Sequence, residues 1–135
     1  MSQENVEVVR SIIDAINARD LDRAFEPAHE DLEADWSNSI GPHGGSVYRG
    51  SERARELFES FLEAWEEFRW EPQEIIEVDE ARVVVVNRVR MRGRGSGVQV
   101  DATGAQLWTI TGGKVRSITI YQSKADALEA AGLGD

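Results

Sequence analysis

Cysteine is absent from this sequence of 135 residues, and histidine occurs only twice, as His29 and His43. Without cysteine the chain has no disulfide scaffold, no thiol nucleophile, no iron–sulfur cluster and no zinc site built on thiolates. The spacing of the two histidines matches no standard histidine zinc motif. We therefore expect no metal site, and any chemistry has to rest on carboxylate, tyrosine, arginine or bound water.

Long hydrophobic runs and a net positive charge are missing as well. The longest apolar run, Val83–Val86, is far shorter than the roughly 18–20 residues that span a bilayer. The first residues lack the basic and apolar regions of a secretory signal, so we expect a cytoplasmic protein that does not enter membranes. The 15 basic and 25 acidic residues give a net charge of −10, which argues against binding to nucleic acid.

The composition that remains is typical of one compact domain spanning residues 1–135. The hydrophobic fraction is 41%, which is ordinary for a globular protein and unlike a disordered chain. Val6, Val9, Ile13 and Ile16 recur at three- and four-residue steps. This period places them on one face of a helix that closes near residues 17–19.

A short second helix and a loop are expected next. Asp20 is a good N-cap for this helix, which should end near Glu26 because Pro27 has no amide hydrogen to donate. A short strand is predicted over Leu32–Trp36. The stretch from 37 to 47 is rich in serine, glycine and proline, which is typical of a loop and predicts a lid or rim.

The second half of the chain predicts one long helix followed by strands. An apolar stripe runs from Ala54 to Phe68, with Ser51 as the expected N-cap and Pro72 as the break. After Trp70 the period changes to two, and glycine-rich turns follow. The predicted strands are Trp70–Val78, Ala81–Arg92, Gly97–Ile110 and Val115–Gln122, followed by a short helix over Lys124–Ala131. Helices first and an antiparallel sheet afterwards indicate an α+β fold with the helices on one side of the sheet.

Three local strings carry a resemblance to a known family. Residues 17–22 read N-A-R-D-L-D, residues 48–50 read Y-R-G before the long helix, and residues 107–115 read L-W-T-I-T-G-G-K-V. In this order they resemble the nuclear transport factor 2-like superfamily over roughly residues 4–130, and within it the SnoaL-like domain proteins. The resemblance implies a cone-shaped, strongly curved and mostly antiparallel sheet, with the N-terminal helices on its concave face around a pocket. It also implies a homodimer formed through the sheets, and no metal or organic cofactor.

The fold hosts several enzymes, so function has to be argued from residues. Ketosteroid isomerase uses an aspartate base together with a tyrosine and a protonated aspartate. The matching positions here are Asp35, Ile12 and, with the register uncertain by one, Gln106. Because Ile12 cannot donate a hydrogen bond and Gln106 is not an acid, the resemblance to this catalytic set covers only Asp35.

Asp35 is nevertheless the candidate catalytic residue. A carboxylate with apolar walls can acquire a raised pKa and move a proton next to a carbonyl, as in SnoaL-type cyclases. The plainer interpretation is that Asp35 ends a strand and is solvated or hydrogen-bonded to the following loop. His43 is a candidate proton carrier on the predicted lid, or a loop residue without function. The candidate pocket residues are Trp36, Tyr48, Arg88, Gln106, Trp108 and Tyr121.

Arginines recur along one predicted strand, at Arg88, Arg90 and Arg92, with no acidic residue between positions 81 and 94. Limonene-epoxide hydrolase has an arginine and an aspartate two apart on such a strand, and a second aspartate near the position of Ile120, so its acids have no counterpart here. Strand alternation places these arginines on one face and Asn87, Val89 and Met91 on the other. Either Arg88 points inward to bind an anionic or carbonyl-bearing ligand, or the arginines face solvent or the acids of a partner subunit.

These observations favour a protein that binds a small apolar molecule, with a carbonyl or carboxylate as its polar group. Proton transfer by Asp35, of the isomerase, cyclase or dehydratase type, is one version of this function. The alternative is a non-catalytic module for ligand binding or dimerisation.

Overall fold

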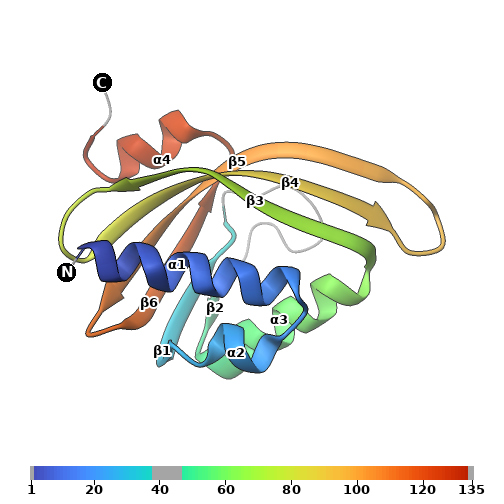
Figure 1. The fold of residues 1–135 in the computed structure, drawn as a ribbon, viewed down its shortest axis with the longest axis horizontal. Helices are drawn as coiled ribbons and strands as arrows, with labels where there is room; N and C mark the ends of the chain where they lie inside the picture. Colours follow the sequence, from blue (N-terminus) through green and yellow to red (C-terminus); the bar gives the residue numbers. More distant parts are fainter. Residues whose placement is uncertain (1, 38–46, 134–135) are drawn as a thin grey trace.

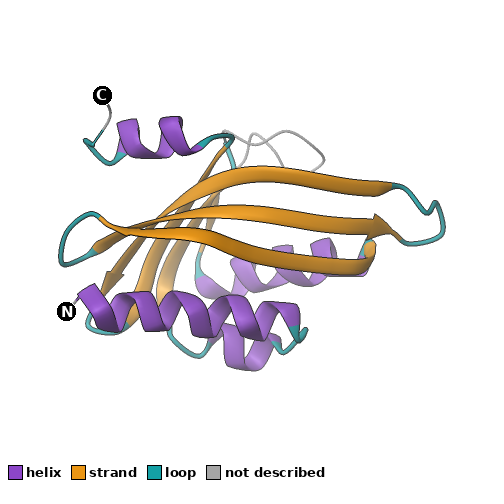
Figure 2. Cartoon of the chain, turned by 45° about the horizontal axis from the view of Figure 1, so that its top comes forward, coloured by secondary structure: helices purple, strands orange, loops and turns teal. Residues whose placement is uncertain are grey.

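The computed structural model describes residues 2–37 and 47–133. Helices α1, α2 and α3 cover the concave face of one curved sheet, and α4 covers part of the opposite face (Figures 1 and 2). This arrangement confirms the predicted α+β fold class. The helices are α1 (Ser2–Asn17), α2 (Leu21–Phe25), α3 (Ser51–Glu63) and α4 (Lys124–Ala130); the strands are β1 (Ala28–Asp35), β2 (Val47–Arg49), β3 (Trp65–Glu77), β4 (Arg82–Gly93), β5 (Gln99–Thr111) and β6 (Lys114–Tyr121).

The sheet has six strands in the order β2-β1-β6-β5-β4-β3. Among the described strands, β1 and β6 are the one parallel pair, and the other neighbours are antiparallel. The long strands β3, β4 and β5 extend beyond the end of α1 (Figure 1). At that end α1 does not cover the concave face of the sheet.

The two faces of β4 bury different cores, as strand alternation requires. Val83 and Val85 are fully buried on the concave face, where they belong to the same cluster as Ile13 of α1. Val84 is buried on the opposite face, in a cluster with Ala127 of α4. The run Val83–Val86 is therefore a strand packed on both sides, and this explains why it is uniformly apolar.

The N-A-R-D-L-D junction fastens the end of α1 to distant parts of the chain. The side chain of Asn17 accepts a hydrogen bond from the backbone N–H of Trp70 at 2.8 Å and donates one to its carbonyl at 2.9 Å. Arg19 has a φ of 59°, and its guanidinium donates to the carbonyl of Leu62 in the last turn of α3 and to that of Trp65 at the start of β3. The residues of this motif therefore hold the end of α1 against β3 and the last turn of α3.

The prediction that the long helix continues to Phe68 is wrong. The helix α3 ends at Glu63, and β3 begins at Trp65. Phe68 and Trp70 pair with Met91 and Val89 of β4, so sheet formation overrides the helical period that the aromatic residues extend. The predicted start of this strand, Trp70, is therefore later in the chain than the observed start, Trp65.

Smaller corrections concern the ends of other elements. The N-cap of α3 is Gly50, with a φ of 97°, and Ser51 is the first helical residue. The strand β1 begins at Ala28 rather than Leu32 because it extends along β6, and β2 was not predicted. The cap expected at Asp20 is confirmed, since its side chain accepts a backbone N–H bond in the first turn of α2, and Ser123 caps α4 in the same way.

Candidate functional site

A cavity of about 350 Å³ lies on the concave face of β3, β4 and β5. The described residues that line it have aromatic, aliphatic, amide or hydroxyl side chains, and none of these carries a charge at neutral pH. The lining residues are Trp36, Phe58, Phe61, Phe68, Trp70, Val89, Met91, Ala102, Thr103, Gly104, Gln106, Ile120, Tyr121 and Gln122. Such a surface suits an apolar molecule and offers no counter-charge to an ion.

Aromatic rings from α3, from β3 and from the residue that follows β1 form one side of the cavity. The ring centroid of Trp36 lies 6.1 Å from that of Phe58 and 5.6 Å from that of Phe61, both edge to face. Phe61 contacts Phe68 of β3 in the same manner at 5.5 Å. Edge-to-face contacts hold rings in defined orientations, so this wall has a fixed shape.

A second, smaller cavity of about 30 Å³ lies deeper in the core. Its lining residues are all apolar, and Phe58 and Trp70 line both cavities. A void of this size without polar partners is expected to stay dry. The inner wall of the main cavity therefore adjoins a part of the core that is incompletely filled.

Gln106 and Trp108 face the same side of β5 and are joined by a hydrogen bond. The indole Nε1 of Trp108 donates to Oε1 of Gln106 at 2.9 Å. Trp108 is fully buried, whereas Gln106 lines the main cavity. The structure thus places one predicted pocket residue at the main cavity and the other beneath it, where Trp108 lines the smaller cavity.

Three buried side-chain atoms on β3 and β4 have no hydrogen-bond partner among the described residues. They are Nε1 of Trp70 on β3, and Oδ1 of Asn87 and Nε of Arg92 on β4. The Nε of Arg92 lies 3.4 Å from a carboxylate oxygen of Glu66, so the two neutral groups are the unpaired ones. Asn87 is only 3% exposed, and its amide nitrogen reaches nothing closer than the carbonyl of Val85 at 3.5 Å. An unpaired buried polar atom costs about 1–3 kcal/mol, so this asparagine weakens the fold.

Replacing Asn87 with valine is expected to raise the free energy of unfolding by about 1 kcal/mol. Valine suits a buried strand and removes the unpartnered oxygen. Urea denaturation followed by circular dichroism measures the change. A less stable Asn87→Val protein would show instead that the amide makes a favourable contact.

Asp35 lies at the end of β1 and is not part of the cavity lining. Its Oδ1 accepts hydrogen bonds from the backbone N–H of Ser37 at 2.9 Å and from its hydroxyl at 2.6 Å. Ala34 is buried in the core, so alternation directs Asp35 to the other face of β1. The carboxylate therefore stabilises the turn that follows the strand, which is the plainer of the two interpretations.

Tyr121 lies at the cavity and also contacts the cluster beneath α4. Burial raises the pKa of its hydroxyl, and the negative charge of Asp35 raises this pKa further. Tyr121 is consequently protonated at neutral pH and can donate a hydrogen bond.

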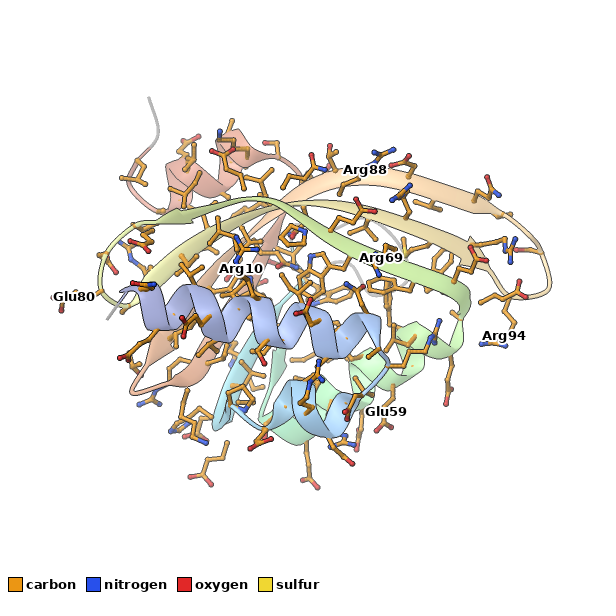
Figure 3. The ribbon with its side chains drawn as sticks, in the orientation of Figure 1. Arg10, Glu59, Arg69, Glu80, Arg88 and Arg94 are labelled. Carbon is orange, nitrogen blue, oxygen red and sulfur yellow. The ribbon has the colours of Figure 1, made fainter. Side chains whose placement is uncertain are left out.

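The other predicted site residues lie elsewhere. Tyr48 is half-buried on β2 and packs against the main core, outside the cavity lining. Arg88 points away from α1, on the convex side of the sheet (Figure 3). His43 falls outside the described residues.

The arginines of β4 pair with acids of their own chain on adjacent strands. Arg88 binds Asp101 of β5 through two nitrogens at 2.9 and 2.7 Å, which lowers the pKa of the Asp101 carboxyl. Arg90 pairs with Glu71 and Arg92 with Glu67, both of β3. Neither an inward Arg88 nor pairing with a partner's acids is needed to satisfy these charges. The homodimer expected from the resemblance stays a prediction.

Several lining residues were missed as pocket residues by reasoning from the sequence. Phe58 and Phe61 belong to the apolar stripe of α3, which predicts core rather than cavity. Val89 and Met91 carried a usable signal, because alternation placed them opposite the arginines. A sequence shows that such a face is apolar but not whether a helix fills the space above it.

Comparison with known proteins agrees with this architecture. Residues 9–118 match the model of the SnoaL-like domain. No curated protein sequence matches significantly. Among the helices of the described residues, none has the length and apolar character needed to cross a membrane.

Solved structures with the same fold share little sequence identity with this chain. TerC, co-crystallised with polyporic acid, has a TM-score of 0.77 at 21% identity, covering 96% of this chain and 98% of that one. RV0760c from Mycobacterium tuberculosis, in complex with estradiol-17beta-hemisuccinate, has a TM-score of 0.77 at 13% identity, covering 90% and 95%. A putative polyketide cyclase from Xanthomonas campestris pv. campestris has a TM-score of 0.73 at 16% identity, covering 96% and 98%.

Proposed function

The chain belongs to the SnoaL-like domain family, and we propose on this premise that its cavity binds an uncharged, largely apolar small molecule. The observation that carries the proposal is the lining of the 350 Å³ cavity, in which the described residues form an aromatic wall and include no charged side chain. An ionised ligand would lose its hydration there without gaining a counter-charge. Of the two ligand types expected from the sequence, the lining supports the carbonyl-bearing one over the carboxylate.

The size of the cavity also supports small-molecule binding. Pockets for such ligands typically have volumes of roughly 300–1,000 Å³, and this one lies near the lower end. Two proteins with the same fold were crystallised with small organic molecules, which supports small-molecule binding here. Apolar contact with the rings of Trp36, Phe58 and Phe61 supplies the affinity.

Proton transfer by Asp35 is the finer version of the function, and the geometry supports it less well than binding. The carboxylate accepts two hydrogen bonds, from the backbone N–H and from the hydroxyl of Ser37. It would have to leave these partners and turn around the strand end to reach a ligand. We therefore propose a binding protein, with Asp35 as a structural residue of the strand end.

A pair of fluorescent probes tests the proposal. N-phenyl-1-naphthylamine is uncharged, and 1-anilinonaphthalene-8-sulfonate has the same rings with one added negative charge. We expect the uncharged probe to bind with enhanced fluorescence, and the sulfonate to bind at least about tenfold more weakly, since each factor of ten is about 1.4 kcal/mol. Equal affinity for both probes would contradict an uncharged site.

Filling the cavity should abolish the binding of the uncharged probe. Val89→Phe adds a ring to a lining position of β4, and we expect its affinity to fall at least about tenfold, or about 1.4 kcal/mol, while the thermal midpoint stays close to that of the parent. Val98→Phe makes the same change at a residue that is 56% exposed in the β4–β5 hairpin, and Asp35→Asn changes a residue outside the lining. Both controls should bind like the parent. Unchanged binding by Val89→Phe would place the probe elsewhere.

A further inference from the structure

We infer that Gln106 selects ligands that carry an uncharged carbonyl oxygen, and that Trp108 is the positioning residue that holds the Gln106 amide as a donor. This inference deepens the proposed function and rests on it. It names the polar group of the ligand, which the apolar lining alone does not specify.

The orientation of the Gln106 amide follows from the chemistry of its partner. A carboxamide has an oxygen that accepts and a nitrogen that donates, and the two ends exchange when the group turns over. The indole Nε1–H of Trp108 can only donate, so the amide oxygen faces it at 2.9 Å. Trp108 is 0% exposed and packs against Trp70 at 6.2 Å between ring centroids, so it cannot turn to release the amide.

The amide nitrogen is consequently left with two N–H groups to donate. Gln106 lines the cavity, and the described residues give this nitrogen no acceptor. Its neighbours across the sheet are Val85 of β4 and Ile120 of β6, whose side chains cannot accept a hydrogen bond. The amide nitrogen of Gln106 is therefore a donor of fixed orientation among apolar groups, and a ligand with an acceptor atom would satisfy it.

The charge of the lining decides which acceptor fits. Among the described residues, no lysine, arginine or histidine lines the cavity, so a carboxylate would be buried there with uncharged donors alone, at a high desolvation cost. A ketone or ester oxygen accepts the amide N–H and carries no charge to desolvate. Arg88, which could have served an anion, is bound to Asp101 on the other face of the sheet.

The test compares two uncharged naphthalenes that differ in one carbonyl group. Prodan, 6-propionyl-2-dimethylaminonaphthalene, carries a ketone, and 2-dimethylaminonaphthalene lacks it. Both are titrated by fluorescence into the parent protein and into Gln106→Met, which keeps the length of the side chain and removes the donor. We expect prodan to bind Gln106→Met about five- to tenfold more weakly, as the loss of one hydrogen bond predicts, and the ketone-free compound to bind both proteins equally within about twofold.

Infrared spectroscopy of bound prodan gives a readout that a purely structural role would not change. A carbonyl that accepts a hydrogen bond stretches at a lower frequency, so bound prodan should show the lowered band in the parent and lose it in Gln106→Met. Trp108→Phe keeps an aromatic ring but frees the amide, and should give a mixture of the two bands. Equal weakening of both naphthalenes in Gln106→Met, or an unchanged band, overturns the inference. If the parent binds neither compound, the proposed function itself fails.

Discussion

Replacing Trp108 with alanine is expected to lower the free energy of unfolding by about 3–5 kcal/mol, the usual cost of deleting a buried aromatic side chain. Trp108 is the largest fully buried side chain of the described residues. It lies between α1 and the sheet, beside a cavity of about 30 Å³ that its removal would enlarge. A loss of this size is a large share of the roughly 5–15 kcal/mol that stabilises a typical domain.

Urea denaturation followed by far-ultraviolet circular dichroism measures this effect. Trp36→Ala is the matched control, because Trp36 is half-buried at the main cavity rather than in the core. We expect Trp36→Ala to cost about 1–2 kcal/mol, since less apolar surface is lost. A cost below about 1.5 kcal/mol for Trp108→Ala would show that the core is not built around this residue.

Replacing Asn17 with alanine is expected to lower the free energy of unfolding by about 2–4 kcal/mol. β3 is an edge strand of the sheet, so the backbone N–H and carbonyl of Trp70 on its outer side have no neighbouring strand to bond. The side chain of Asn17 takes the place of that strand through its two hydrogen bonds. Removing it leaves a donor and an acceptor unpaired, each at about 1–3 kcal/mol before water compensates.

Asn5→Ala is the control within the same helix. Asn5 is buried like a core residue but makes a single long-range hydrogen bond, from its amide nitrogen to the carbonyl of Glu80 at 2.8 Å. We expect this variant to lose about 1–2 kcal/mol, roughly half the effect at Asn17. Equal effects at the two positions, measured by the same denaturation curves, would contradict the role given to Asn17 at the sheet edge.

The junction around Asn17 also shows what could be predicted from the sequence. The end of α1, the cap at Asp20 and the end of α2 near Glu26 follow from local rules, and the structure confirms them. The bonds of Asn17 to Trp70 and of Arg19 to Leu62 span more than forty residues. Local rules contain no information about such partners, so the reason for the motif became evident only in the structure.

The same division explains the errors in the second half of the chain. Trp65 and Phe68 continue the helical period of α3, and only their pairing with β4 makes them strand. The arginines of β4 were placed correctly on one face by alternation. Their partners Asp101 and Glu71 depend on strand register, which the sequence does not reveal.

The sequence allowed some residues of the cavity lining to be predicted, but not the position of the cavity itself. Gln106, Trp36 and Tyr121 were proposed as pocket residues and do line the cavity. Arg88 and Tyr48 do not line it. Arg88 pairs with Asp101 on the convex face, and the ring of Tyr48 packs against the core beside β1. Whether a face of a sheet is covered or hollow depends on where the helices end, and this is a property of the whole fold.

Crystals of the protein grown with N-phenyl-1-naphthylamine would show directly whether the cavity binds an uncharged small molecule. We expect electron density for the probe on the concave face, in contact with Trp36, Phe58 and Val89. Density for the probe only outside this cavity, with the cavity filled by ordered water or collapsed side chains, would contradict the claim that the chain binds uncharged small molecules there.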